Sequence, residues 1–294
     1  MAGADLRGAS LAGARLDGYI LTGANLVGAD LSGASFRGAD LREAYLRGAN
    51  ARNADFSGAQ LAVADMTLAH LDGARFDDAD LSRSRLSNAS LTGASMKRAF
   101  LPGATLIKAD LSHANLQDAM LSGADLTQSN LVDAMATRAT FGAAQSGQQE
   151  PSPAVMAGAD LRGGDFGAAN FVSVNLRESR LEGGRFVGAD FANADLSWSR
   201  AAGADFSHCP MGWLKAYGTD LRDTKLVGAN LVRAQMEGAN LSGADMSRAV
   251  LDGTNLNQTD MTGARVEKAS ARAALMNDVT HLPAVLRSTN DGER

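Results

Sequence analysis

Large aromatic side chains, prolines and cysteines are scarce in this sequence. Aromatic residues make up 5% of the 294 positions, five residues are prolines, and Cys209 is the single cysteine. One cysteine excludes an internal disulfide, so the fold does not depend on an oxidising compartment. So few large side chains are unusual for a globular core and favour a thin, repetitive body packed with small residues and leucine.

The sequence also lacks a positive excess and a long apolar run. Its formal net charge is −5, and no basic cluster is present that would neutralise phosphates, which argues against direct nucleic-acid binding. No apolar run reaches the roughly 18 residues of a membrane span. The first residues have neither the charged nor the apolar region of a signal peptide. We therefore expect a cytoplasmic protein without membrane contact.

What the sequence contains in abundance is one five-residue unit, such as the Ala-Asn-Leu-Val-Gly of residues 24–28. A large apolar residue recurs at nearly every fifth position from Leu6 to Phe141, and an alanine usually stands two positions before it. A period of five fits neither the 3.6 residues of a helix nor the 2.0 of a strand. The chain must therefore turn after each short extended piece.

A second, longer period of four pentapeptides is superimposed on the first. Phenylalanines have this spacing at Phe36, Phe56 and Phe76. Charges of alternating sign have it at Asp165, Arg185, Asp205, Lys225, Asp245 and Arg265. If four pentapeptides make one coil, like positions of successive coils would lie above one another at about 4.8 Å, the strand spacing. Alternating charges at that separation avoid like-charge contacts. The spacing predicts a coil with four sides.

With its repeated Ala-(Asp/Asn)-Leu-X-X motif, the sequence resembles pentapeptide-repeat proteins over residues 2–141 and 154–276. The resemblance implies an all-β fold, a right-handed quadrilateral parallel β-helix with four pentapeptides per coil and inward-pointing leucine and alanine. The residue types agree with this fold. Asp and Asn tolerate turn geometry and bond nearby amides, and glycine relieves strain where φ is positive.

The motif divides the chain into two repeat blocks, 1–141 and 159–276, separated by a loop or irregular coil at 142–158 and followed by a C-terminal cap and tail at 277–294. Gly, Ser, Gln and Pro dominate residues 142–153, which is typical of a loop. This segment is either one side of a coil that bulges outward or a loop extruded from a continuous solenoid. We favour the extruded loop, because separate blocks would expose two extra sheet edges.

Three other places are expected to depart from the regular repeat. In residues 207–218, Leu214 is too large for an alanine site and Pro210 removes a ladder donor, which predicts a distorted coil. From about 270 to 288, apolar residues have roughly helical spacing, which predicts a short helical cap on the last coil. The N-terminal coil has no such cap, so we expect a longer parent protein, a homodimer through a terminal coil, or a partner on that end.

The sequence indicates no catalytic, metal or cofactor site. His208 and Cys209 are adjacent, as in a metal-binding pair or a thiol–imidazole nucleophile. Cys209, however, occupies the inward small position, where a buried core residue is expected. A filled solenoid with flat sides offers no concave pocket that would perturb the pKa of a catalytic group. We therefore predict a non-enzymatic protein without metals or cofactors.

The residues that the repeat does not explain indicate where a protein partner would bind. Exposed aromatic residues are frequent interface anchors, so Trp213 and Tyr217 are candidates. Gln148, Gln149 and Glu150 in the loop are further candidates. We expect a structural or protein-interaction scaffold that presents flat faces and a projecting loop, as a module of a larger protein or of an effector-delivery assembly.

The resemblance also implies an alternative function. Some pentapeptide-repeat proteins mimic duplex DNA, bind type II topoisomerases such as gyrase, and give resistance to quinolones or related poisons. A mimic of DNA needs acidic rows along its length. The outward row Asp5, Asn25, Tyr45, Asp65 and Arg85 is mixed instead. The charge pattern therefore favours the scaffold.

Overall fold

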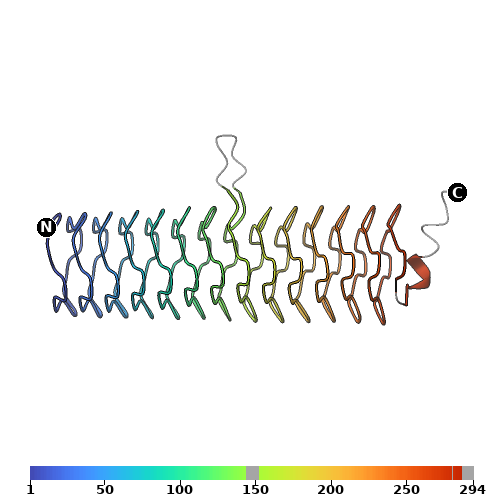
Figure 1. Cartoon of the computed structure of the whole chain (residues 1–294), viewed down its shortest axis with the longest axis horizontal. Coiled ribbons are helices and arrows are strands. Elements are labelled where there is room, and N and C mark those ends of the chain that lie inside the picture. The colour runs from blue at the N-terminus through green and yellow to red at the C-terminus, as the bar shows by residue number, and fades with distance from the viewer. Residues whose placement is uncertain (144–151, 280, 287–294) are drawn as a thin grey trace. The chain divides into compact units, whose positions relative to one another are not determined.

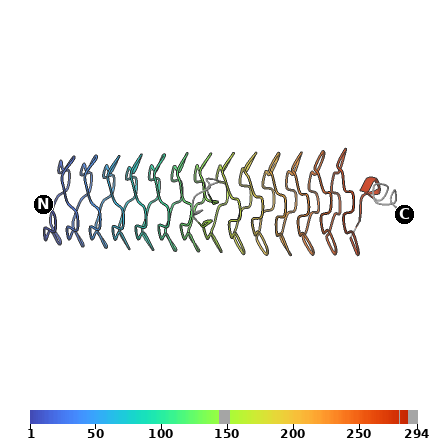
Figure 2. The ribbon, with the colours of Figure 1, turned by 90° about the horizontal axis from the view of Figure 1, so that it is seen from above.

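The computed structural model describes residues 1–143, 152–279 and 281–286. It forms two compact units, Met1–Val155 and Met156–Arg294, and both are built from the same pentapeptide turn. In Figures 1 and 2 each unit is a stack of coils. Within the described residues, no helix has the length and apolar character that a bilayer crossing requires.

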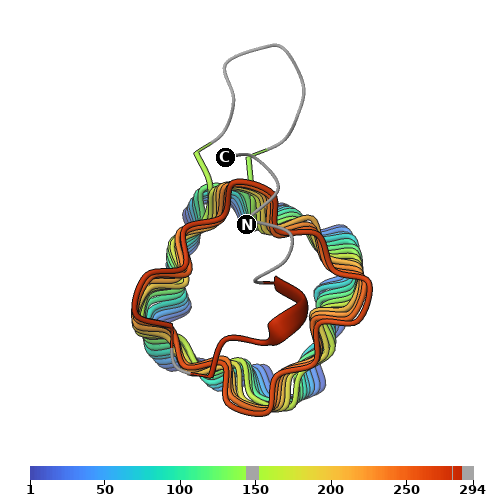
Figure 3. The ribbon, with the colours of Figure 1, turned by 90° about the vertical axis from the view of Figure 1, so that its right-hand side faces the viewer.

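Each pentapeptide contains one bridge residue, which stands just before the large apolar residue. Asn25 forms parallel bridges with Asp5 and Tyr45, each four pentapeptides away along the chain. Its N–H donates to Ala4 O at 2.9 Å, and the N–H of Leu26 donates to Tyr45 O at 2.7 Å. Bridges with the same spacing recur in both units, so four pentapeptides complete one coil. Figure 3 shows its four-sided outline. The predicted right-handed quadrilateral β-helix is confirmed.

The chain turns sharply after each large apolar residue. Ala29 N–H donates to Leu26 O at 3.0 Å, which closes a four-residue turn. The third residue of this turn has a positive φ, for example 65° at Gly28, a conformation that glycine adopts without strain. We call it the corner position. Some corner positions have large side chains in this left-handed conformation, including Trp198 at φ 64° and Trp213 at φ 59°.

The large apolar residues and the alanines fill the interior of each unit. Phe36, Phe56 and Phe76 are fully buried, and their successive rings stack at 5.0 Å with interplanar angles of 5° and 6°. In the second unit, Phe166 and Phe186 stack in the same way at 5.1 Å. Such offset aromatic contacts add to the stabilisation from burial. The predicted phenylalanine ladders are therefore confirmed.

In the second unit, several inward small positions hold threonine instead of alanine. Thr219 Oγ1 donates to Leu196 O at 2.9 Å, and Thr254 Oγ1 donates to Leu231 O at 2.8 Å. Both threonines are fully buried. Because each of these two buried hydroxyls reaches a backbone carbonyl, the coil accepts the polar side chains without leaving either hydroxyl unsatisfied.

The first unit contains an insertion between Phe141 and Ala154. In an ordinary turn, the N–H of the third residue after the large apolar residue donates to the carbonyl of that apolar residue. Here Ala154 N–H makes this bond, to Phe141 O at 2.8 Å. Val155 pairs with Asp125, so the two bridge partners are separated by six pentapeptides instead of four, and two pentapeptides of chain are added at this one turn. The repeat resumes at Ala154, inside the segment 142–158 that the sequence marks as irregular. Residues 144–151 lie outside the described part of the chain.

Residues 207–218 continue the repeat with ordinary turns instead of forming the predicted distorted coil. The lost ladder donor at Pro210 removes one bridge, because Pro210 pairs with Asn230 but not with Asp190. Leu214 N–H makes the ordinary turn hydrogen bond at 3.2 Å. Leu214 is buried in an alanine site, while Ala216 occupies the neighbouring site for a large residue, so large and small side chains exchange places. Pro210 lacks an N–H, but its carbonyl still accepts from Phe191 at 2.8 Å.

The first coil of the first unit and the last coil of the second unit are covered differently. In the second unit, residues 271–279 follow the repeat, so the helix predicted from about 270 begins later; the described helix spans residues 284–286. Leu286 in this helix is fully buried, and Figure 3 shows the helix lying across the end of the last coil. In the first unit, Leu6, Leu11 and Leu16 are partly exposed, and Leu21 is the first large apolar residue to be fully buried.

Candidate protein-binding corners

Side chains at corner positions extend toward the corner position of the next coil. Where that position is glycine, a long side chain from the preceding coil rests on it. A Cβ atom added at Gly73 would lie 2.5 Å from Asn53 Oδ1, and one added at Gly103 would lie 3.6 Å from Arg83 Cγ. The corners of each unit are therefore ordered rows of side chains, in which corner residues of successive coils are neighbours.

Several rows neutralise their own charges. Arg98 donates two hydrogen bonds of 2.7 Å to the carboxylate of Asp78, its neighbour along a corner row. In the second unit, Arg185 Nη1 lies 2.8 Å from Asp165 Oδ1, so these two residues of the row with alternating charges form an ion pair. Elsewhere, hydrogen bonds from the Arg42 side chain hold the pKa of Asp40 at about 2. Much of the charge of these surfaces is thus balanced within the chain.

The corner of Trp213 contains its own cation. Arg233 occupies the same corner of the next coil, and its guanidinium carbon lies 4.8 Å from the centroid of the Trp213 ring. A cation at this distance is attracted to the negative face of the indole. Trp213 is 53% exposed, so this contact lies at the surface. Trp213 is therefore part of an intramolecular cation–π pair.

The corner of Trp198 is different, because its ring lies over a glycine. The indole atoms Cζ3, Cε3 and Cη2 would be 2.3, 2.5 and 2.9 Å from a Cβ added at Gly218, and such similar distances place the ring above this residue. Trp198 nevertheless remains 60% exposed. A cleft of about 260 Å³ opens beside it, lined also by Tyr217, Glu237, Gly238 and Gln258.

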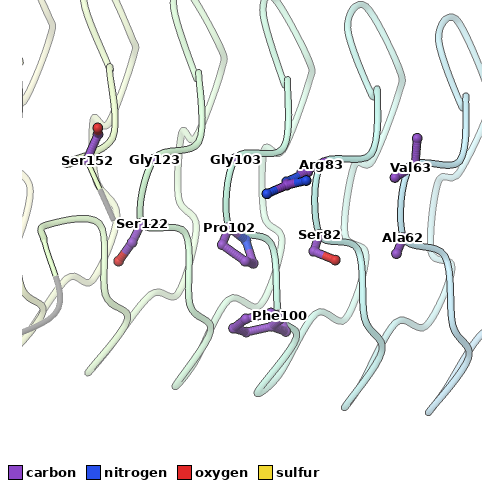
Figure 4. Close-up of a pocket in the computed structure, with 10 residues that line it drawn as sticks. All are labelled: Ala62, Val63, Ser82, Arg83, Phe100, Pro102, Gly103, Ser122, Gly123 and Ser152. Atoms are coloured by element: carbon purple, nitrogen blue, oxygen red, sulfur yellow. The ribbon is translucent and has the colours of Figure 1, made fainter. Parts of the chain in front are cut away.

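A second, longer groove follows a corner of the first unit (Figure 4). It has a volume of about 630 Å³ and crosses four successive turns, from Val63 to Gly123, before it reaches Ser152. Phe100 and Val63 line it and are 40% and 50% exposed. Arg83 extends over Gly103 in the same groove and makes no ion pair with the described residues. The groove thus combines apolar surface with one cationic group.

Cys209 and His208 do not form a reactive pair. Cys209 is fully buried, its Sγ lies 3.0 Å from Phe186 O, and burial raises the pKa of its thiol to about 12. His208 points outward along its corner, where its Nδ1 would lie 2.8 Å from a Cβ at Gly228. Cys209 is therefore a core residue, as predicted. The described residues contain no group of three or more His, Cys, Asp or Glu that would hold a metal ion.

The structure separates the two aromatic candidates predicted from the sequence. Trp213 belongs to the corner with Arg233, whereas Tyr217 lines the cleft of Trp198 at the next corner. The loop candidates Gln148, Gln149 and Glu150 lie outside the described residues. The roles of Glu237 and Phe100 were missed, because their surroundings come from neighbouring coils. The sequence does contain a sign of the Trp198 cleft, because the residues that follow Trp198 along its corner row, Gly218 and Gly238, have no side chain.

These corners belong to a solenoid that is defined by its five-residue repeat. The sequence matches the family model described as pentapeptide repeats over residues 1–106, 109–144, 169–207 and 217–278. The chain therefore belongs to the pentapeptide-repeat family, whose members are structural and protein-interaction scaffolds. A comparison with curated proteins gives no significant match.

Several solved structures are similar to this chain. HetL, a pentapeptide repeat protein involved in heterocyst differentiation regulation from the cyanobacterium Nostoc sp. strain PCC 7120, is 31% identical; the match covers 78% of this chain and 88% of HetL, with a TM-score of 0.34. QnrB1, a plasmid-mediated fluoroquinolone resistance protein, is 17% identical, with 68% and 91% covered and a TM-score of 0.28. Rfr23 from the cyanobacterium Cyanothece 51142 is 26% identical, with 38% and 64% covered and a TM-score of 0.20.

Proposed function

We propose that this chain is a non-enzymatic, cytoplasmic scaffold that binds a protein partner along its corners. The observation that supports this proposal best is the pair of open clefts at Trp198 and Phe100, one in each unit, on surfaces where many other charged side chains are paired. Exposed aromatic residues beside a cleft are favoured anchors for a partner protein. The filled interior leaves binding to the outer surface.

The regular ladder of backbone hydrogen bonds supports the same role. Because hydrogen bonds at the bridge residues join successive coils within each unit, the side chains of a corner row are held at fixed spacing. A rigid row of this kind loses little conformational freedom when a partner binds, which favours affinity. A projecting loop at Gln148, Gln149 and Glu150 remains a further predicted contact.

Site-specific crosslinking tests the scaffold function. A photoreactive amino acid is placed at Val63 in the groove of the first unit or at Gln258 in the cleft of the second unit. Lys108, an exposed corner residue that lines neither cleft, serves as the control. In cells of the native host we expect the same protein to be captured at one or both cleft positions and not at Lys108. Failure to enrich any protein at either cleft position over the control would contradict the proposal.

The surface gives little support to a mimic of DNA. Acidic side chains that would imitate phosphates are paired with arginines, as in Asp78 with Arg98 and Asp118 with Arg138. A gyrase supercoiling assay, with and without a quinolone, tests this alternative. Neither inhibition nor protection is expected at micromolar protein. A homodimer through a terminal coil is a separate prediction, and sedimentation velocity would detect it.

A further inference from the structure

We propose that the Trp198 cleft binds one arginine or lysine side chain of a protein partner. This inference rests on the proposed scaffold function and names the chemistry that the partner would need. One face of the Trp198 ring covers Gly218, and the side chain is still 60% exposed, so the opposite face is open to solvent. Such a flat, exposed indole face is the best aromatic platform for a cation.

The neighbouring corner shows the same platform with its cation in place. Trp213 and Trp198 have similar corner conformations, with φ values of 59° and 64°. The residue at the Trp213 corner of the next coil is Arg233, whose guanidinium group lies 4.8 Å from the indole centroid. The residues at the Trp198 corner of the next two coils are Gly218 and Gly238, which have no side chain to offer. The cleft therefore lacks the cation that the Trp213 corner supplies from within the chain.

Glu237 provides the negative charge that a bound cation would need. It lines the cleft together with Trp198, and its Oε2 accepts a hydrogen bond of 3.2 Å from Asn255 Nδ2. Glu237 makes no ion pair within the part of the chain that the structure describes. Two cations, Lys215 and Arg200, stand on the flanking bridge rows and do not line the cleft. A basic side chain from a partner would lie between the indole face and this carboxylate.

The size of the cleft fits a single side chain. Its volume of about 260 Å³ is below the roughly 300–1,000 Å³ that is typical of pockets for drug-sized ligands and cofactors. Tyr217 and Gln258 complete the lining and can donate hydrogen bonds to the backbone of a bound segment. The combination of aromatic face, carboxylate and small volume therefore points to a basic residue on an extended segment of the partner.

The test is a titration followed through the two indole N–H signals in a two-dimensional ¹H–¹⁵N NMR spectrum. The probes are pentapeptides of glycine with arginine, lysine, glutamate or norleucine at the centre, and methyl glucoside as a neutral stacking ligand. A Trp213→Phe variant assigns the signals. We expect the arginine and lysine peptides to shift the Trp198 signal saturably, and the other probes to bind at least about fivefold more weakly, if at all. The Trp213 signal should stay in place.

A Glu237→Gln variant separates charge recognition from simple stacking. It keeps the size of the side chain, so the fold is retained, and we expect it to weaken binding of the arginine peptide about fivefold. An unmoved Trp198 signal, equal binding of the norleucine peptide or of methyl glucoside, or an unchanged affinity in Glu237→Gln would overturn the inference. If these titrations fail while crosslinking at Val63 or Gln258 still captures a partner, the scaffold function stands and only the basic-residue site is wrong.

Discussion

Replacement of Gly218 by alanine measures how firmly the Trp198 ring is seated, and Gly238→Ala is its matched control. Both glycines are corner residues of the same row, with φ values of 58° and 69°. A Cβ at Gly218 would lie 2.3 Å from the Trp198 ring, whereas a Cβ at Gly238 would meet nothing within 4 Å. Both variants therefore introduce the left-handed strain of alanine, and only Gly218→Ala also displaces the ring.

The expected cost follows from these two contributions. Alanine in the left-handed region costs about 1 kcal/mol relative to glycine. Trp198 is 60% exposed, so about two fifths of a side chain of roughly 250 Å² is covered. At about 25 cal/mol per Å², full loss of that contact would cost about 2.5 kcal/mol, and a tilted ring would lose about half of it. We expect destabilisation of about 1 kcal/mol for Gly238→Ala and about 2 kcal/mol for Gly218→Ala.

Urea unfolding followed by circular dichroism gives both free energies, and fluorescence reports the ring itself. In a Trp213→Phe background, Trp198 is the only indole, so its emission should move to longer wavelength in Gly218→Ala and stay unchanged in Gly238→Ala. Equal destabilisation by the two alanines, together with unchanged emission, would show that the ring is not held over Gly218. Trp198 would then present no fixed indole face to a partner.

The remaining predictions concern the core, the insertion and acid stability. Leu116→Asp should unfold the first unit locally, because Leu116 is fully buried and an unpaired charge there costs several kcal/mol; the outward Asn115→Asp is the control, and equal melting temperatures would contradict the inward assignment. Deletion of residues 144–153 should leave the circular dichroism spectrum and urea midpoint intact, whereas removal of 144–154 should shift the register and destabilise the unit. Hydrogen bonds from Arg42 lower the pKa of Asp40 in the folded protein from 3.8 to about 2. Ionised Asp40 therefore stabilises the folded state above about pH 4, and this contribution is lost as the pH falls toward 2. The urea midpoint should fall over that range, less so in Arg42→Gln; a rising midpoint would refute the linkage.

The periodicity of the sequence was sufficient to predict which residues point inward and which coils neighbour one another. A spacing of five assigns Leu26 to the core and Asn25 to the surface, and a spacing of four pentapeptides stacks Phe36 on Phe56. These assignments hold because the ladder keeps one register within each repeat block, so a single count fixes the neighbours of each position. Local propensity contributes little to the fold in comparison with this register.

The predictions for residues 207–218 and for the start of the C-terminal helix rest on local composition instead of register. Leu214 is too large for an alanine site by itself, but Ala216 leaves room at the adjacent inward position. Leu275 and Met276 have helix-like spacing with the residues after them, yet they occupy a bridge position and a large apolar position of the repeat. In both segments the phase of five was intact, and it predicted the structure better than residue size or helical spacing did.

The candidate sites could not be found by reading one pentapeptide at a time, because corner side chains are defined by their neighbours in the adjacent coils. A large side chain at a corner position is strained relative to glycine, by about 1 kcal/mol. At Arg98 and Trp213, contacts with Asp78 and Arg233 offset this strain within the chain. Trp198 is followed along its row by two glycines, and no cation of the described residues covers its exposed face. The contact of one indole face with Gly218 offsets the strain at this corner, and the opposite face of the ring is left for a partner.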